Sequence, residues 1–233
     1  MLTFVAQSFR YSVLSLSAVA AAWFVAPASA ATVNLGGNWQ ASWDASLDGL
    51  VNLTNISITG NTISLVKNAN FTQGPGGSGL FPTIPITFTQ TGASTVDHIV
   101  ILDEVINNNT GVSWNGFRMD ILSGIGVASF DVAATAASGG PLPIGFAIAP
   151  FTTASFSSAN QRLDIGGGTV ANGGVWLPGS GANGGALSMS VLSTSVGPFS
   201  SFSLKETPVP TPGALALLTL AAFTVGHRSR RRR

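Results

Sequence analysis

Hydrophobic and polar residues alternate in short runs through the middle of the chain. Val51–Thr59 and Thr62–Lys67 flank a Gly-Asn pair, which predicts a β-hairpin. Thr83–Thr89 carries isoleucine or phenylalanine at every second position, which indicates a strand with one buried face. His98–Ile106 is almost continuously apolar, so we expect a central strand that is buried on both faces.

Further β-prone runs follow, separated by residues that favour turns. They are Phe117–Leu122, Ser129–Ala133, Pro143–Ala149, Arg162–Ile165, Leu187–Leu192 and Ser201–Lys205. Gly139–Gly140 and Asn172–Gly185 indicate long loops that are rich in glycine. No long stripe with a helical period appears between the runs. The pattern predicts one all-β domain over residues 31–207, an antiparallel β-sandwich or jelly roll.

The first 30 residues follow a different pattern. Arg10 is followed by an apolar run over Tyr11–Val25, and small residues occupy Ala28 and Ala30. About 15 apolar residues would span about 22 Å as a helix, which is short for a bilayer core of about 30 Å. Two small residues at this spacing suit a signal peptidase. We therefore expect residues 1–30 to be a cleaved signal helix, with cleavage before Ala31, or alternatively after Ala28.

The last 26 residues have three parts. Residues 208–212 alternate proline with other residues, and proline fixes φ and lacks an N–H, so we expect an extended linker. Gly213–Val225 is uncharged and predicts a short hydrophobic helix, which begins a segment over residues 213–233. That segment ends in Arg228, Arg230, Arg231, Arg232 and Arg233. Arginines after an apolar helix stay cytoplasmic, so the helix is expected to anchor the chain transiently in the inner membrane, with the domain periplasmic.

This tail, together with Pro210, Thr211 and Pro212, resembles the PEP-CTERM sorting signal of exported proteins in Gram-negative bacteria. The resemblance covers residues 209–233, and Thr211 stands where that family has its central glutamate. It implies that an exosortase-type enzyme removes the tail and that the protein reaches the cell surface or the extracellular matrix. It also implies association with extracellular polysaccharide.

Charge and composition exclude several classes of function. Residues 31–207 contain nine acidic and four basic side chains, although the net charge of the whole chain is +1. Nucleic-acid binding needs clustered lysine and arginine on the folded surface, so we expect no nucleic-acid partner. The chain has no cysteine, which excludes disulfides and thiolate metal sites. We expect neither a cofactor nor a zinc site.

Histidine offers little for catalysis. His98 is the only histidine in residues 31–207 and follows Asp97 directly. Neighbouring residues of a strand point to opposite faces, so we expect that Asp97 does not orient the His98 ring. A serine hydrolase needs a serine, a base and an orienting acid within reach of one another. His98 is therefore interpreted as structural.

Carboxylates give two candidate pairs. Asp103 and Glu104 are adjacent in a predicted strand and are expected to diverge, unlike the convergent pair of a glycosidase. Asp44 and Asp48 could share a loop and bind calcium together with backbone carbonyls. Surface acids in contact with water are the favoured interpretation of this second pair.

Tryptophan gives the best candidate for ligand binding. The body has four tryptophans, near residues that favour loops or strand ends. Such rings either stack on sugars or fill the ends of a core, and the core is the favoured interpretation. Polar side chains close to one of them would supply hydrogen bonds. The candidate glycan contacts are Trp39, Trp43, Trp114, Trp176, Asn115 and Asp120.

Three functions are compatible with these features. The favoured one is a non-enzymatic exported protein of the cell surface or extracellular matrix, processed by signal peptidase and a sorting enzyme and associated with polysaccharide. The alternative is a carbohydrate-binding or adhesive module with a specific glycan ligand. A secreted glycoside hydrolase ranks third, because the carboxylates show no convergent arrangement.

Overall fold

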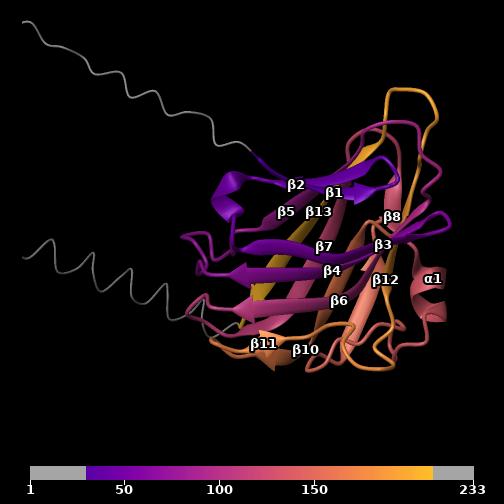
Figure 1. The fold of residues 1–233 in the computed structure, drawn as a ribbon. Helices are drawn as coiled ribbons and strands as arrows, with labels where there is room; N and C mark the ends of the chain where they lie inside the picture. Colours follow the sequence, from indigo (N-terminus) through magenta and orange to yellow (C-terminus); the bar gives the residue numbers. More distant parts are fainter. Residues whose placement is uncertain (1–29, 212–233) are drawn as a thin grey trace, which may run out of the picture.

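The computed structural model describes residues 30–211, which form two β-sheets packed face to face (Figure 1). In spatial order, the seven-stranded sheet contains β1 (Ala31–Gly36), β2 (Trp39–Trp43), β5 (Ile84–Gln90), β13 (Ser201–Pro210), β7 (Trp114–Ser123), β10 (Arg162–Val170) and β9 (Thr153–Ser157). The six-stranded sheet contains β3 (Val51–Thr59), β4 (Thr62–Phe71), β6 (His98–Asn108), β12 (Leu187–Val191) and β8 (Ala128–Phe130), with β11 (Val175–Trp176) also paired to β6. Two short helices, η1 (Ala45–Leu47) and α1 (Val132–Ala137), complete the elements of this region.

The expected all-β sandwich is confirmed, but one pairing departs from the antiparallel rule. β4 and β6 run parallel, whereas the other strand pairs are antiparallel. The chain leaves β4, crosses to the other sheet as β5 and returns as β6. That crossover makes the six-stranded sheet mixed.

Alternating burial explains most of the strands. β4 and β5 bury every second residue, and Ile84, Ile86 and Phe88 all face the core as expected. The Gly-Asn turn joins β3 to β4, with Thr59 opposite Thr62 and a positive φ of 58° at Gly60. A left-handed backbone at this place costs glycine nothing and allows the tight reversal.

Three sequence expectations were wrong in detail. β6 is not buried on both faces, because its residues alternate between buried and partly exposed along the strand. Pro143–Ala149 forms turns, with a single bridge between Phe146 and Gly185, instead of a strand. Ser129–Ala133 is divided between β8 and α1, because the Asp131 carboxylate caps the helix by accepting a hydrogen bond from the N–H of Ala134 at 2.8 Å.

The last strand runs further than expected. β13 continues through Pro208 to Pro210 and stays paired with β7, so the sandwich extends three residues beyond the expected boundary at 207. Thr211 still donates its N–H to the carbonyl of Ser113, so the odd-numbered residues here face β7. The backbone groups of Pro208 and Pro210 point away from β7, toward the side where β5 lies. The pairing with β5 ends at Glu206, so the N–H groups that these prolines lack interrupt no hydrogen bond of the sheet.

The two glycine-rich loops pack against each other at the backbone level. A Cβ on Gly185 would lie 2.0 Å from the carbonyl oxygen of Gly145, and one on Gly140 would lie 2.7 Å from that of Gly184. Such distances are impossible for a side chain, so glycine is required at both crossings.

The flanking helices that the sequence predicts fall outside this region. The signal helix of residues 1–30 and the hydrophobic helix Gly213–Val225 lie beyond the described residues, apart from Ala30. Neither of the helices described between residues 30 and 211 has the length and apolar composition that crossing a membrane requires.

Candidate functional site

The four tryptophans of the candidate glycan site are buried. Trp39 is 1% exposed, Trp43 is 7% exposed, and Trp114 and Trp176 are not exposed at all. A sugar-stacking platform needs an open ring face, so these four residues do not form one and that interpretation is corrected. The favoured interpretation, that they fill the core, describes all four.

Each indole N–H also has a partner inside the protein. Trp39 and Trp114 donate to the hydroxyls of Ser193 and Thr110, both at 3.2 Å. Trp43 donates to the carboxylate of Asp48 at 3.2 Å, and Trp176 donates to the carbonyl of Ile148 at 3.1 Å. Buried indoles normally satisfy their N–H in this way.

The polar partners expected near Trp114 also have structural contacts. Asn115 is placed so that its amide nitrogen donates to the carbonyls of Val209 and Pro210, at 3.2 and 3.0 Å. Asp120 lies on β7 opposite Arg162 of β10 and Lys205 of β13. Neither side chain shares an exposed surface with the Trp114 ring, which has none.

The Asp44 and Asp48 pair supports the local fold. Asp44 caps η1 by accepting a hydrogen bond from the N–H of Ser46 at 2.8 Å, and the hydrogen bonding to Ser46 lowers the pKa of the Asp44 carboxyl. Asp48 accepts the Trp43 indole N–H. Within residues 30–211, no group of three or more histidine, aspartate or glutamate side chains is arranged to hold a metal ion.

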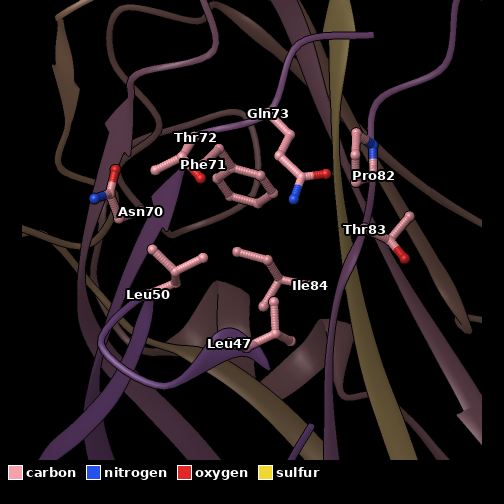
Figure 2. A pocket seen from close by; sticks show the side chains of 9 residues that line it. All are labelled: Leu47, Leu50, Asn70, Phe71, Thr72, Gln73, Pro82, Thr83 and Ile84. Atoms are coloured by element: carbon pink, nitrogen blue, oxygen red, sulfur yellow. The ribbon is translucent and has the colours of Figure 1, made fainter. Parts of the chain in front are cut away.

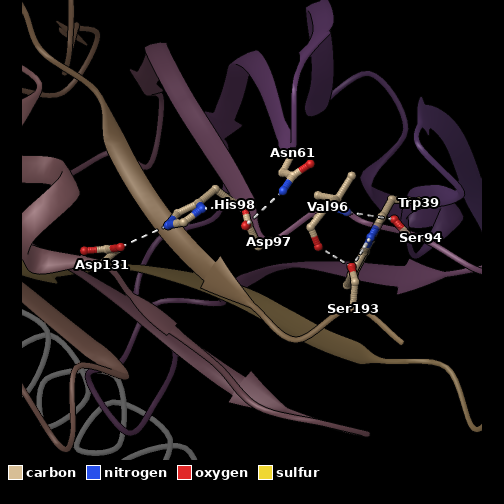
Figure 3. Close-up of polar contacts among 8 residues, drawn as sticks. All are labelled: Trp39, Asn61, Ser94, Val96, Asp97, His98, Asp131 and Ser193. Carbon is tan, nitrogen blue, oxygen red and sulfur yellow. Dashed lines mark hydrogen bonds and ion pairs between the residues drawn. The ribbon is translucent and has the colours of Figure 1, made fainter. Parts of the chain in front are cut away.

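His98 has a more specific environment than the sequence predicts. Its Nδ1 lies 2.7 Å from Oδ1 of Asp97, and its Nε2 lies 3.0 Å from Oδ2 of Asp131 (Figure 3). The expectation that Asp97 cannot orient this ring was wrong, because β6 begins at His98 and Asp97 lies just outside the regular strand. Asp131 also caps α1, so the histidine links the start of β6 to the helix.

The two aspartates set the protonation of this cluster. The hydrogen bond to Asp97, and then that to Asp131, raises the pKa of His98 above 6.5 against the opposing effect of partial burial. The His98 hydrogen bond lowers the pKa of Asp97, and the N–H of Ala134 lowers that of Asp131. The two aspartates therefore favour the imidazolium form of the ring that lies between them.

This arrangement predicts a pH-dependent contribution to stability. The folded pKa of His98 lies above the unfolded value of about 6.5, so the contribution is complete below that pH and disappears as the pH rises through the folded pKa. Urea unfolding should find wild type more stable than His98→Gln by on the order of 0.5 kcal/mol near pH 6, and equal to it near pH 9. A difference that grows with pH would contradict the assignment.

A second cluster lies inside the sandwich. Lys67 of β4, Glu104 of β6 and Glu206 of β13 have no exposed surface. Nζ of Lys67 lies 2.7 and 2.9 Å from the two carboxylate oxygens of Glu206, and 3.3 Å from Oε2 of Glu104. Lys67 and Glu104 are neighbours in the six-stranded sheet, and Glu206 faces them from the seven-stranded sheet.

Burial controls the charges in this cluster. Burial raises the pKa of Glu104 to about 8, so this carboxyl is protonated at neutral pH. Burial lowers the pKa of Lys67, but Glu104 and Glu206 outweigh it and the net direction is upward. A neutral Glu104 leaves one cation and one anion, which avoids the cost of a net charge in the core.

The position of Lys67 within its strand, more than its residue type, could have predicted this cluster. In β4, Lys67 occupies the same alternation as Ile63, Leu65, Ala69 and Phe71, which all face the core. A charged residue at an apolar position of a strand is a candidate for buried pairing. In β6 the register shifts between Ile101 and Asp103, and this bulge hides the same signal for Glu104.

The surface of residues 30–211 has hollows of different sizes. Leu47, Leu50, Phe71 and Ile84 point into a pocket of about 40 Å³ (Figure 2), which has room for little more than a water molecule. A larger hollow of about 350 Å³ lies at the Gly60 turn and is lined mainly by small and polar residues. No charged side chain lines either hollow.

The processing sites of the sequence prediction lie at the borders of the described region. Ala28, Pro212 and the five arginines are outside it, whereas Ala30, Ala31, Pro210 and Thr211 are inside. Comparison of the chain with known protein families, with curated proteins and with solved structures finds no match in any of the three.

Proposed function

We propose that this is a non-enzymatic exported protein of the cell surface or extracellular matrix, processed at both ends. The observation that carries the proposal is the extent of the sandwich. β1 starts at Ala31, the residue after the expected signal cleavage, and β13 ends at Pro210, within the expected sorting motif. The strands of the sandwich therefore lie between the two expected processing points.

The exposed side of the seven-stranded sheet supports the association with polysaccharide. Its central strands present hydroxyls of threonine and serine beside Arg118, Asp120, Arg162 and Asp164. Asp164 pairs with both arginines, each through a 2.9 Å contact to its Nε. Hydroxyl, carboxylate and guanidinium groups on an exposed sheet face can hydrogen-bond to sugar chains, and we propose that the polysaccharide contacts the protein here.

The termini of the mature protein test the proposal. Intact mass spectrometry of the protein from medium and cell envelope should find Ala31 as the first residue. The last residue should be Thr211 or one shortly after it, because a cut before Thr211 would remove residues paired with β7. Recovery from both fractions of a chain that still carries Arg233 would contradict processing.

A further inference from the structure

The Lys67, Glu104 and Glu206 cluster brings together the groups that amide formation requires, an amine, a carboxyl group and an acid. An amine and a carboxyl group form an amide when they meet in water-free surroundings with an acid at hand, because loss of water needs no oxidant or cofactor. All three groups are fully buried, and Nζ of Lys67 lies within 2.9 Å of both oxygens of Glu206. The carboxyl carbon that an amine would attack lies between those two oxygens.

The surroundings of the cluster favour neutral groups. Leu65 and Ala69 flank Lys67 on the same face of β4, Ile106 follows Glu104 in β6, and Leu204 precedes Glu206 in β13, all buried. Burial acts against both charges of the ion pair, because they lose their hydration, although the two glutamates still hold the pKa of Lys67 above its usual value and the neutral amine is the minor form. The neutral amine is the nucleophile that amide formation requires.

Glu104 supplies the acid. Its Oε1 is buried without a hydrogen-bond partner, whereas its Oε2 lies 3.3 Å from Nζ of Lys67. A buried carboxyl oxygen without a hydrogen-bond partner is costly to keep and calls for an explanation, such as a catalytic role. Burial keeps this group protonated near neutral pH.

We propose that Lys67 and Glu206 become joined by an intramolecular isopeptide bond, with Glu104 as the catalytic acid. A proton passes from the Lys67 ammonium to the Glu206 carboxylate, and the free amine then attacks the carboxyl carbon. Glu104 gives its proton to the departing hydroxyl, which leaves as water, and regains one from the nitrogen. One C–N bond forms, one C–O bond breaks, and Glu104 ends unchanged.

Such a bond would connect the two sheets covalently. It would join β4 to β13, which are 139 residues apart in sequence at the linked positions. β13 is also the strand that leads into the expected sorting tail. A force applied to that tail would then be transmitted from β13 to the six-stranded sheet through a covalent bond.

Mass spectrometry of the denatured full-length chain tests the proposal directly. Folded wild type should be lighter than its composition by one water in most molecules, and digestion should yield a branched peptide joining the segments around Lys67 and Glu206. Trypsin should fail to cut after Lys67 but still cut at Arg118. A folded wild type with its complete mass and no branched peptide would overturn the proposal, whatever the variants do.

Variants separate the roles of the three residues. Glu206→Gln should yield the same final product by losing ammonia in place of water, and Lys67→Arg should keep its complete mass. Glu104→Gln should slow bond formation about 100-fold or more after refolding, because a general acid contributes at least that much. Lys205→Arg, one residue from Glu206, is the control and should lose one water as wild type does. Equal rates for folded Glu104→Gln and wild type would remove Glu104 from the mechanism.

Discussion

Replacing Lys67 by methionine is expected to lower the free energy of unfolding by at least about 3–5 kcal/mol, the usual cost of removing one partner from a buried ion pair, and a Lys67–Glu206 amide in wild type would add to this loss. The substitution keeps a long side chain in the core but leaves two glutamates without their cation. Lys67 is the partner that the structure gives to Oε2 of Glu104 and to both oxygens of Glu206. Urea unfolding at neutral pH, compared at equal m value, measures the loss.

A second substitution identifies the cause. Adding Glu206→Gln to Lys67→Met removes the uncompensated anion and should restore about half of the lost stability, because replacing both partners of a buried pair costs less than breaking it. Lys205→Met, on the partly exposed side of the same strand as Glu206, is the matched control and should stay within about 0.5 kcal/mol of wild type. A Lys67→Met protein as stable as this control would show that the pair is not structural.

Much of the sandwich could be predicted because its strands alternate clearly. β4 and β5 place apolar residues at every second position, and the sequence pattern found both. β1, β2 and β9 were missed, because each is only five or six residues long and contains only two β-branched or aromatic residues. Their pairing with neighbouring strands, which the sequence does not display, stabilises them as strands.

The site was harder to predict than the fold because it depends on contacts between distant segments. Glu206 follows Lys67 by 139 residues, and only the packing of the two sheets brings them together. The pairing of His98 with Asp131 likewise depends on where α1 begins, 33 residues later. Alternation tells which residues of a strand turn inward, but it does not tell which inward residue of the other sheet they meet.

The tryptophans show that the neighbouring residues in the sequence do not tell whether a ring is buried. Turn-forming neighbours suggested exposed loops, yet the Trp39 and Trp114 rings both lie inside the sandwich. Their place follows from other aromatic rings, such as Phe202, whose ring centroid is 6.2 Å from that of Trp39. A large apolar ring next to glycine or serine is therefore as compatible with the end of a core as with a binding surface.

Replacing Trp114 by alanine is expected to lower the free energy of unfolding by about 3–5 kcal/mol. The ring is fully buried and packs edge-on against Phe71 and Phe81, with ring centroids 5.4 and 6.3 Å apart. It packs at a tilt against Phe117, at 6.0 Å. Its removal leaves a cavity beside the end of β13, because Trp114 lies opposite Pro210 in the β7–β13 ladder. Thermal and urea unfolding should both show the loss.

The same variant distinguishes a core tryptophan from a sugar-binding one. Trp114→Phe keeps most of the ring and should lose much less stability, whereas Leu142→Ala, at a side chain that is 88% exposed, should stay within about 0.5 kcal/mol of wild type. If the protein binds a polysaccharide through the exposed face of its seven-stranded sheet, folded Trp114→Ala should bind it with unchanged affinity per folded molecule. A variant of wild-type stability that had lost only its polysaccharide binding would show that the ring contacts the sugar, and the buried position described above would then be wrong.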